Sequence, residues 1–382
     1  MKIALDVLRA CSPGAGKAGY YWYIYYIVSN LLKADSKNEY VLFANFIKGK
    51  HLETTREFFS LFPDASFRER ISRIPPQVWR SLGLPIELAV GPVDVFHGMV
   101  DYVPPTRSAK RIVTLHDLAY RRIPHLLKKE WIQANEKITT ASTKRAHHII
   151  AVSEFTKREA SAHLNLPPDK ITVIHHGVDP LYRQLDNEEL IAKALASYSV
   201  KKPYLLYIGT FWPHKNIDRL IEAYYRLRKQ ESIPHQLVLV GAKGWRFEGT
   251  FNRIHELGLE KVITCTGPVP QEDMPLLYAG ADAFVFPSLH EGFGMPVLEA
   301  MASGVPVLTS NVCSLPEIAD GAALLVDPTE VEQIAEGIFK IISDRSFADR
   351  LRESGKKRAA EFTWEKAAMA TLGVYQKVCS SA

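Results

Sequence analysis

The residue types and spacings that favour chemistry lie in one stretch, 287–307, which reads Pro-Ser-Leu-His-Glu-Gly-Phe-Gly-Met-Pro-Val-Leu-Glu-Ala-Met-Ala-Ser-Gly-Val-Pro-Val. The apolar run at 282–286 predicts a strand before it. Pro296 and Gly304 bound a predicted helix, because proline suits the first helical position and glycine commonly ends a helix. The Gly-Phe-Gly turn at 292–294 then presents backbone N–H groups beside a helix N-terminus, which favours the binding of a phosphate or another oxyanion.

Two carboxylates frame this turn, Glu291 in the loop and Glu299 in the predicted first helical turn. Acids near a helix N-terminus stay ionised, and an ionised acid only accepts hydrogen bonds. A diphosphate site between two acceptors suits a ligand with hydroxyls on either side of its phosphates, as in a nucleotide sugar. A Gly-x-Gly alone is equally typical of an ordinary capped helix, but the full string favours the ligand site.

The string from Glu291 to Glu299 resembles the signature of glycosyltransferase family 4, whose members are retaining enzymes of the two-domain GT-B fold. The resemblance implies that Glu291 and the Gly-Phe-Gly amides hold the transferred sugar and that Glu299 holds the nucleotide ribose. It is weakest over residues 49–92. Other segments that resemble the family, in order along the chain, are residues 12–20, 113–118, 150–156, 171–180 and 207–216.

Short β-rich runs alternate with helical patterns throughout, which predicts parallel sheets built from βαβ units. The expected fold is α/β of the GT-B type, with two Rossmann-like doubly wound domains that face each other across a cleft. We expect an acceptor-binding domain over 1–180 and a nucleotide-sugar-binding domain over 181–365, with a final helix at about 366–382 that packs back onto the first. The expected strands are 2–8, 40–45, 93–97, 111–115, 149–152, 171–174, 204–208, 236–240, 262–265, 282–286, 305–309 and 323–326.

The composition is that of a globular protein long enough for two domains: 382 residues, 47% hydrophobic and 23% charged. The four cysteines are scattered without a Cys-x-x-Cys, which favours a reducing compartment and argues against a disulfide framework or a zinc site. The start does not resemble a signal peptide, and the longest aromatic-apolar run, 20–28, is too short to span a bilayer.

Charge is unevenly distributed along the chain. The net charge is +5, but residues 1–180 hold 25 Lys and Arg against 17 Asp and Glu, so this half is +8 and the remainder is −3. A basic first half favours an anionic acceptor or an anionic membrane surface. Ordinary variation of surface charge is the alternative explanation.

Two further residues, Lys215 and His116, resemble the family's reactive groups. Lys215 follows a predicted strand at the start of a helix, where a cation neutralises a leaving diphosphate. His214 precedes it, where the family often has arginine. His116 lies at a predicted strand end, and the resemblance implies that it contacts the transferred sugar, while the neighbouring Asp117 orders the loop.

Two other loops complete the expected site. The glycines of residues 14–19 allow close approach to a ligand, and the resemblance implies that this loop faces the donor phosphates and the acceptor. The aromatic run that follows, 20–26, suits sugars and membrane interfaces. The loop 267–270 resembles the one that brackets the nucleotide base.

The catalytic candidates are Glu291, His116 and Lys215; the nucleotide-sugar-binding candidates are Glu299, Gly292, Phe293, Gly294, Met295, Val297, His214, Gly209, Val269, Gly16 and Gly19; the acceptor-binding candidates are Tyr20, Tyr21 and Asp117.

No Asp-x-Asp occurs in the chain, so we expect no metal and no cofactor besides the nucleotide-sugar donor. The expected activity is retaining, metal-independent transfer of a hexose, first of all mannose from GDP-mannose, to a saccharide or lipid-linked saccharide acceptor in surface-polysaccharide synthesis. A UDP-hexose donor and a GT-B sugar-nucleotide epimerase are the alternatives. We expect no nucleic-acid partner and a cytoplasmic protein attached peripherally to the inner face of the cytoplasmic membrane, with a soluble acceptor as the alternative.

Overall fold

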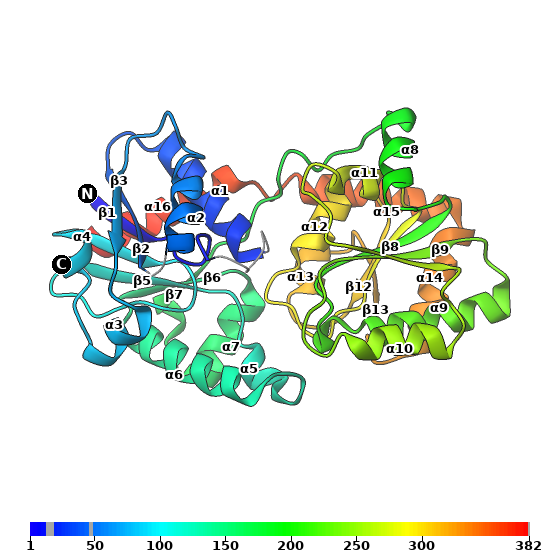
Figure 1. Cartoon of the computed structure of the whole chain (residues 1–382), viewed down its shortest axis with the longest axis horizontal. Coiled ribbons are helices and arrows are strands. Elements are labelled where there is room, and N and C mark those ends of the chain that lie inside the picture. Colours follow the sequence, from blue (N-terminus) through cyan, green and yellow to red (C-terminus); the bar gives the residue numbers. More distant parts are fainter. Residues whose placement is uncertain (13–18, 46–48, 381–382) are drawn as a thin grey trace. The chain divides into compact units, whose positions relative to one another are not determined.

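The computed structural model describes residues 1–12, 19–45 and 49–380. The chain forms two compact units (Figure 1). Unit 1 comprises Met1–Gly177 together with Thr363–Ala382, and unit 2 comprises Val178–Phe362. The expected boundaries, at 180 and 365, both lie three residues further along the chain than those of the structure.

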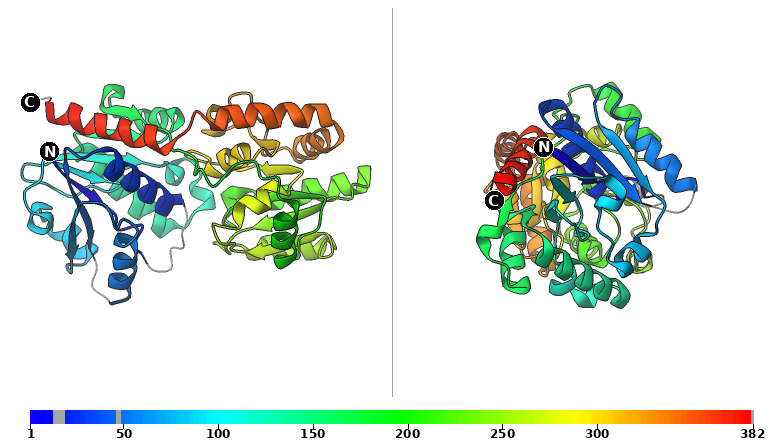
Figure 2. Two further views of the ribbon diagram at one scale, coloured as in Figure 1. Left: turned by 90° about the horizontal axis from the view of Figure 1, so that it is seen from above. Right: turned by 90° about the vertical axis from the view of Figure 1, so that its left-hand side faces the viewer.

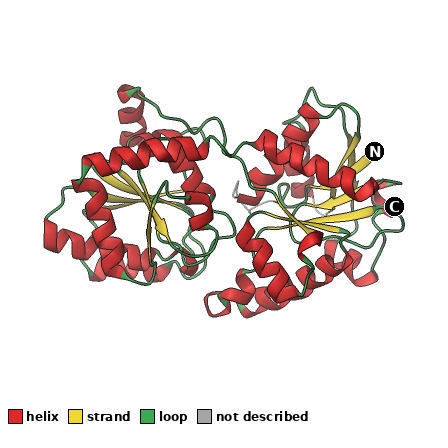
Figure 3. Ribbon diagram, turned by 180° about the vertical axis from the view of Figure 1, so that it is seen from behind, coloured by secondary structure: helices red, strands yellow, loops and turns green. Residues whose placement is uncertain are grey.

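The described part of unit 1 contains a seven-stranded, all-parallel sheet with strand order β3-β2-β1-β4-β5-β6-β7. Helices cover both faces of this sheet, as parallel strands with helical crossovers require (Figure 3). The strands are β1 (Lys2–Asp6), β2 (Glu39–Asn45), β3 (Arg68–Ser72), β4 (Val95–Gly98), β5 (Lys110–Leu115), β6 (His148–Ala151) and β7 (Ile171–Val173). The helices are α1 (Gly19–Ala34), α2 (Gly49–Phe59), α3 (Pro76–Leu82), α4 (Glu87–Val90), α5 (Ala119–Arg122), α6 (Lys129–Arg145), α7 (Glu154–Leu164) and α16 (Trp364–Ser380), with short 3-10 turns η1 (Pro124–Leu126) and η2 (Pro168–Lys170).

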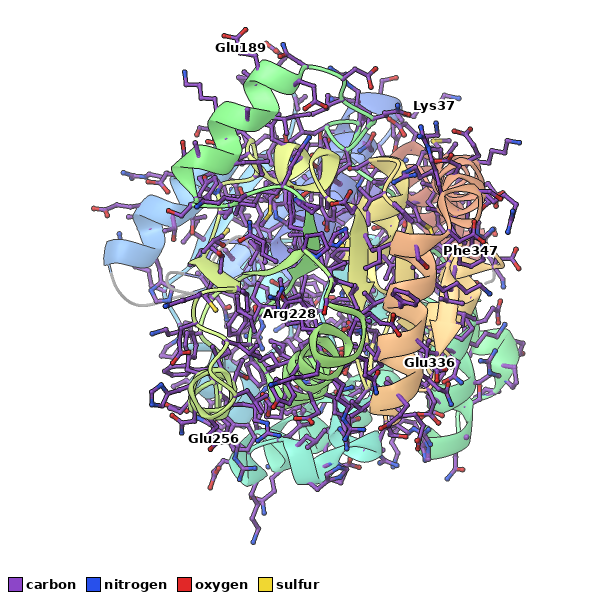
Figure 4. The ribbon with its side chains drawn as sticks, turned by 90° about the vertical axis from the view of Figure 1, so that its right-hand side faces the viewer. Lys37, Glu189, Arg228, Glu256, Glu336 and Phe347 are labelled. Carbon is purple, nitrogen blue, oxygen red and sulfur yellow. The ribbon has the colours of Figure 1, made fainter. Side chains whose placement is uncertain are left out.

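Unit 2, whose residues 178–362 are all described, has a six-stranded parallel sheet with order β10-β9-β8-β11-β12-β13. Its outer helices carry acidic side chains on their exposed faces, among them Glu189, Glu256 and Glu336 (Figure 4). The strands are β8 (Tyr204–Ile208), β9 (Gln236–Val240), β10 (Ile263–Gly267), β11 (Ala283–Phe286), β12 (Val307–Ser310) and β13 (Leu324–Val326). The helices are α8 (Glu188–Ser197), α9 (Ile217–Glu231), α10 (Glu248–Glu256), α11 (Met274–Ala279), α12 (Met295–Ala302), α13 (Leu315–Ala319), α14 (Val331–Ser343) and α15 (Arg345–Ala359), with the 3-10 turn η3 (Pro213–Lys215).

The sequence predicts every described strand except β3, which lies in the segment 49–92. Its residues, Arg-Glu-Arg-Ile-Ser, are mostly charged and exposed, so they lack the apolar run that identifies the buried strands. β3 is the edge strand of its sheet, and charged side chains are what edge strands commonly carry, since they discourage pairing with another chain.

Both sheets are doubly wound, which confirms the expected fold class. In each, strand order reverses beside the first strand of the unit: between β1 and β4 in unit 1, and between β8 and β11 in unit 2. Loops at such a point diverge to opposite faces of the sheet, and ligands of open α/β sheets bind outside the carboxyl ends of the strands there. The fold therefore predicts that ligands bind at the loops after β8 and β11 in unit 2, and at those after β1, β4 and β5 in unit 1.

The last helix, α16, packs against α1 within unit 1 (Figure 2). The indole of Trp364 stacks on the ring of Tyr26, with 5.0 Å between their centroids. The first residue of α16 lies against the backbone of Gly177, the last residue of the first segment of unit 1. A Cβ atom on Gly177 would lie 2.2 Å from the backbone nitrogen of Trp364. No helix in the described part of the chain is long and apolar enough to cross a membrane.

This close approach predicts that Gly177→Ala lowers the free energy of unfolding by about 1–3 kcal/mol, because backbone cannot move aside as a side-chain tip would. Gly373→Ala is the matched control: nothing lies within 4 Å of its Cβ position in the helix. Removing a helical glycine there should stabilise by about 0.5–1 kcal/mol. Urea unfolding followed by tryptophan fluorescence measures both, and equal stability of the two variants would contradict the prediction.

Candidate active site

One buried side chain, Asn216, joins three loops at the carboxyl edge of the unit 2 sheet. Its backbone has a φ of 62°, a left-handed conformation that asparagine tolerates. Its Nδ2 donates to the carbonyl oxygens of Pro287, at 2.9 Å, and Pro328, at 2.6 Å. Its Oδ1 accepts from Arg219 Nη1 at 2.9 Å. The loops after β8, β11 and β13 are thereby fixed relative to one another.

Lys215 and Glu291 form an ion pair where two of these loops meet. The Lys215 Nζ donates to Glu291 Oε1 at 2.5 Å, and the Ser288 hydroxyl donates to the same oxygen at 2.7 Å. The two charged side chains are 17% and 13% exposed, so protein surrounds them while each keeps access to solvent. The structure therefore brings together two of the three expected catalytic residues, and it adds Ser288, which sequence reasoning missed.

The Gly-Phe-Gly turn leads into α12 as the sequence predicts. Gly294 has a φ of 113°, and a Cβ there would lie 2.7 Å from Leu315 Cδ2, so only glycine fits. The Ser314 hydroxyl lies within hydrogen-bond distance of the carbonyl oxygens of Glu291, at 2.9 Å, and Phe293, at 2.7 Å. These bonds fix the turn that leads into α12, whose N-terminus is the positive end of the helix dipole and favours an oxyanion.

Glu299 departs from the expectation in both position and charge. It lies in the second turn of α12, because the helix begins at Met295 and Pro296 is its second residue. The pKa of Glu299 is raised to about 7. Burial is the largest cause, the hydrogen bond from Tyr278 opposes it, and the charge of Asp179 adds to it. The helix dipole acts mainly within the first turn, so the expectation of a fully ionised Glu299 is wrong. The Tyr278 hydroxyl donates to Glu299 Oε2 at 3.0 Å.

The other candidates in unit 2 contribute backbone more than side chains. A Cβ at Gly209 would lie 2.7 Å from the Tyr207 hydroxyl, so this turn has no room for a side chain. The Val297 side chain is buried in the core, and its N–H donates to the Gly294 carbonyl at 3.0 Å. The carbonyl oxygen of His214 accepts from the N–H of Leu289 at 2.8 Å. The remaining candidates are placed as follows: Gly292 is buried in the loop before α12, Met295 is partly exposed as its first residue, and Val269 is buried in the loop after β10.

In unit 1, His116 lies directly after β5 with its ring buried. Its Nε2 bonds to the carbonyl oxygen of Met99 at 3.0 Å, and since a carbonyl only accepts, Nε2 carries the proton and Nδ1 is the acceptor. Burial lowers the pKa of His116 to about 4, so the ring is neutral at pH 7. The rings of Tyr20 and Tyr23 meet it edge-on, with centroids 4.8 and 4.7 Å away.

Asp117 orders its loop, because its Oδ1 accepts from the N–H of Ala119 at 2.8 Å. Behind it lies Asp101, whose pKa is raised to about 7 first by burial and then by the charge of Asp117. Tyr20 is 38% exposed at the start of α1, whereas the ring of Tyr21 packs against its neighbours on α1 and α2. Gly19 begins α1. Gly16 and Gly14, expected to face the donor phosphates, lie outside the described residues.

The sequence did not predict a buried network of side-chain hydrogen bonds, which reaches His116 through the ring of Tyr23. The His97 ring bonds to the Tyr375 hydroxyl at 2.7 Å through Nδ1 and to Thr114 Oγ1 at 2.8 Å through Nε2. Thr114 Oγ1 in turn bonds to the Tyr23 hydroxyl at 2.8 Å. Burial lowers the pKa of His97 to about 3. Polar residues inside apolar parallel strands are the signal that identifies such a network in advance.

Across residues 1–12, 19–45 and 49–380, no group of three or more His, Cys, Asp or Glu side chains is arranged to hold a metal ion. The positive groups of the described site include the Lys215 cation and the N-terminal end of the α12 dipole.

Comparison with family models gives two matches that together cover most of the chain. Residues 22–181 match the model described as Glycosyltransferase Family 4, and residues 191–358 match the model described as Glycosyl transferases group 1. Both charged residues of the Lys215–Glu291 pair, and Glu299, fall within the second match.

Two curated relatives are similar over most of their length. The chain is 35% identical to O-antigen chain mannosyltransferase B of Escherichia coli over 283 residues, which are 74% of each chain. It is 28% identical to O-antigen chain mannosyltransferase RfbU of Salmonella typhimurium over 71% of this chain and 72% of that one. Among solved structures, sucrose-phosphate synthase from Thermosynechococcus elongatus aligns over 100% of both chains with a TM-score of 0.76 and 20% identity, which shows the shared fold.

The raised pKa of Glu299 predicts that stability falls as pH rises from about 4.5 to about 7. The folded state holds this proton more tightly than the unfolded chain, so the contribution is complete below the lower value and lost above the upper one. One proton gives a slope of at most about 1.4 kcal/mol per pH unit. Glu299→Gln is neutral throughout, so its stability relative to the wild type should increase between about pH 5 and pH 7.5. Urea unfolding of both proteins at these pH values is the measurement, and parallel profiles would contradict the prediction.

Proposed function

This chain belongs to glycosyltransferase family 4, and we propose that it transfers a mannosyl residue from a nucleoside-diphosphate mannose to a saccharide acceptor in cell-surface polysaccharide synthesis. The observation that carries the proposal is the Lys215–Glu291 pair directly before the N-terminus of α12. It combines a cation and an oxyanion site for a leaving diphosphate with an acceptor for sugar hydroxyls. The two O-antigen mannosyltransferase relatives support the choice of mannose and of the polysaccharide setting.

Each residue has a definite role in this proposal. Glu291 and the amides of residues 292–294 bind the hydroxyls of the transferred sugar, and Lys215 with the start of α12 stabilises the charge that develops on the diphosphate. Glu299, held by Tyr278, binds the ribose. In unit 1, the neutral His116 offers Nδ1 as an acceptor to a sugar hydroxyl.

The proposed chemistry is transfer with retention and without a metal. The acceptor hydroxyl oxygen forms a bond to the anomeric carbon on the face from which the diphosphate leaves, and the bond from that carbon to the phosphate oxygen breaks. A donor phosphate oxygen takes the hydroxyl proton. The protein supplies positioning and charge stabilisation, and no side chain needs to form a covalent intermediate.

GDP is the first choice of nucleotide and UDP the alternative. Incubation with GDP-mannose and a mannose-containing acceptor should give a product whose new linkage keeps the α configuration of the donor, as read from the anomeric signals in NMR. The rate should be unchanged by EDTA. An inverted linkage would refute retention, stabilisation by UDP alone in a thermal-shift comparison with GDP would refute the nucleotide, and a new sugar nucleotide formed without acceptor would indicate an epimerase.

The three charged residues should fail in different ways when replaced by alanine. Lys215→Ala and Glu291→Ala should each lower kcat by roughly 10²–10³, because they act on groups whose charge changes in the transition state. Glu299→Ala should mainly raise the KM for the donor, since ribose binding is the same before and during reaction.

Because Lys215 and Glu291 share an ion pair, the double variant should lose less than the product of the two single losses. Lys193→Ala, at an exposed lysine of α8, is the control and should keep the wild-type kinetics. If all three site variants also keep them, the assignment of the site is wrong.

We further propose that unit 1 attaches reversibly to the inner face of the cytoplasmic membrane, where a lipid-linked acceptor resides. The +8 charge of residues 1–180 supports this proposal, as do exposed aliphatic side chains such as Leu82, at 65%, and Leu88, at 56%. Basic side chains near an anionic surface contribute about 1 kcal/mol each. Flotation with anionic liposomes at low salt should recover the protein, and high salt or neutral lipid should release it. Failure to float under every condition, together with efficient use of a lipid-free acceptor, would refute attachment.

A further inference from the structure

Beside the proposed donor site, unit 2 contains a pocket of about 430 Å³ formed by the loops after β8 and β9 and the starts of α9 and α10. This volume is within the usual range for a small-molecule site. None of the roles assigned above uses the residues that line it. Those that matter below are Phe211, Trp212, Asp218, Arg246, Glu248 and Thr250.

The two loops are joined so closely that the pocket is preformed. A Cβ at Gly241 would lie 2.0 Å from the Gly209 carbonyl oxygen, and one at Gly244 would lie 2.5 Å from Trp212 Cδ1. The N–H of Phe211 donates to the carbonyl of Ala242 at 3.0 Å, which continues the pairing of β8 with β9 past the strands. The indole of Trp212 is therefore held against the neighbouring loop.

The polar groups of the pocket include both pure acceptors and a pure donor. The Thr250 hydroxyl donates to Asp218 Oδ1 at 2.7 Å, which orients this carboxylate. Arg246 has a φ of 59°, a conformation that is rare for an arginine and typical of functional loops. Its guanidinium lies 4.4 Å from the centroid of the Trp245 ring. Glu248 adds a second carboxylate.

A sugar ring matches this combination better than other small ligands. A pyranose presents an apolar C–H face to an aromatic ring, and its hydroxyls both donate to carboxylates and accept from a guanidinium. A phosphate would meet two carboxylates of its own charge. A purely apolar ligand would take three charged side chains out of water without partners.

The nucleoside of the donor is directed away from this pocket. Right-handed crossovers place α9 and α10 on one face of the sheet and α11 and α12 on the other, as Figure 1 shows. The proposed ribose partners, Glu299 and Tyr278, lie on α12 and α11. A nucleoside bound there lies on the opposite side of the sheet from Asp218 and Thr250. The pocket is therefore left for a different ligand.

We propose that the pocket binds a sugar ring of the acceptor, one beyond the ring that receives the transferred residue; this assignment rests on the proposed transfer to a saccharide. Trp212 is three residues before Lys215 and belongs to the same loop. The rings of Trp212 and His214 have centroids 6.0 Å apart. A saccharide that stacks one ring on Trp212 therefore places the adjoining ring next to the loop that carries Lys215.

The test compares an acceptor long enough to reach the pocket with one that is not. With GDP-mannose as donor, Trp212→Ala should raise the KM for α-linked mannotriose about tenfold, the equivalent of one aromatic contact. The KM for methyl α-mannoside, the KM for the donor and the hydrolysis of donor without acceptor should all stay within about twofold of the wild type. Arg246→Ala, on the other loop, should give the same pattern. Trp131→Ala removes a partly exposed indole from α6 of unit 1 and should change none of these values.

An unchanged KM for mannotriose in Trp212→Ala and Arg246→Ala would overturn the proposal. A loss shared equally by mannotriose, methyl α-mannoside and the donor would also overturn it, because Trp212 would then only position Lys215. If the wild type transfers no mannose, saturation-transfer NMR with mannotriose tests the pocket separately. Binding lost in Trp212→Ala and Arg246→Ala but kept in Trp131→Ala supports the pocket, and equal binding in all three, or none in the wild type, refutes it.

Discussion

The direction of the strands is the constraint on which the unit 2 site depends. All six strands run parallel, so every loop that leaves a carboxyl end emerges at the same edge of the sheet. Residues far apart in sequence, such as Lys215 and Glu291, can therefore meet. The meeting is stabilised by Asn216, whose amide bonds to two other loops. A loop held by backbone carbonyls and one buried amide has few alternative conformations, so the ion pair has a fixed geometry with little entropy to lose on binding.

Environment gives the two glutamates of the site different electrostatic characters. Glu291 has a cation and a hydroxyl on one oxygen, whereas Glu299 has only the Tyr278 hydroxyl and is desolvated. In unit 1 burial lowers the pKa of His116 and His97 and raises that of Asp101, so these three groups are shifted toward their neutral forms. Neutral groups there suit the hydroxyls of an uncharged sugar. Under the proposed function, the positive groups that face the diphosphate, Lys215 and the N-terminus of α12, both belong to unit 2.

The sequence predicted the fold class, the strands with apolar runs and the Gly-Phe-Gly turn, because each has a local cause: a buried parallel strand is apolar, and a left-handed turn needs glycine. It missed β3, whose residues follow no burial pattern because an edge strand needs none. It also missed Ser288, Ser314 and Asn216, since nothing local distinguishes a serine that holds a distant loop. The predicted charge of Glu299 was wrong, because the desolvation that raises its pKa depends on tertiary packing. The hydrogen-bond network from Tyr375 to Tyr23 joins residues of four elements. Spacing along the sequence does not predict which of these residues meet.

The ion pair has a consequence for how the leaving group is stabilised. The family resemblance implies an arginine where this chain has His214, and Glu291 already offsets the charge of Lys215. A diphosphate carries more negative charge than this pair can neutralise. In the proposed reaction the remainder falls to the N-terminal end of the α12 dipole, whose effect decreases within a turn. The Ser314 hydroxyl and the φ of Gly294 fix the turn that leads into this end of the helix. Under the proposed function, the fixed turn before α12 therefore takes over part of the role of a second cation.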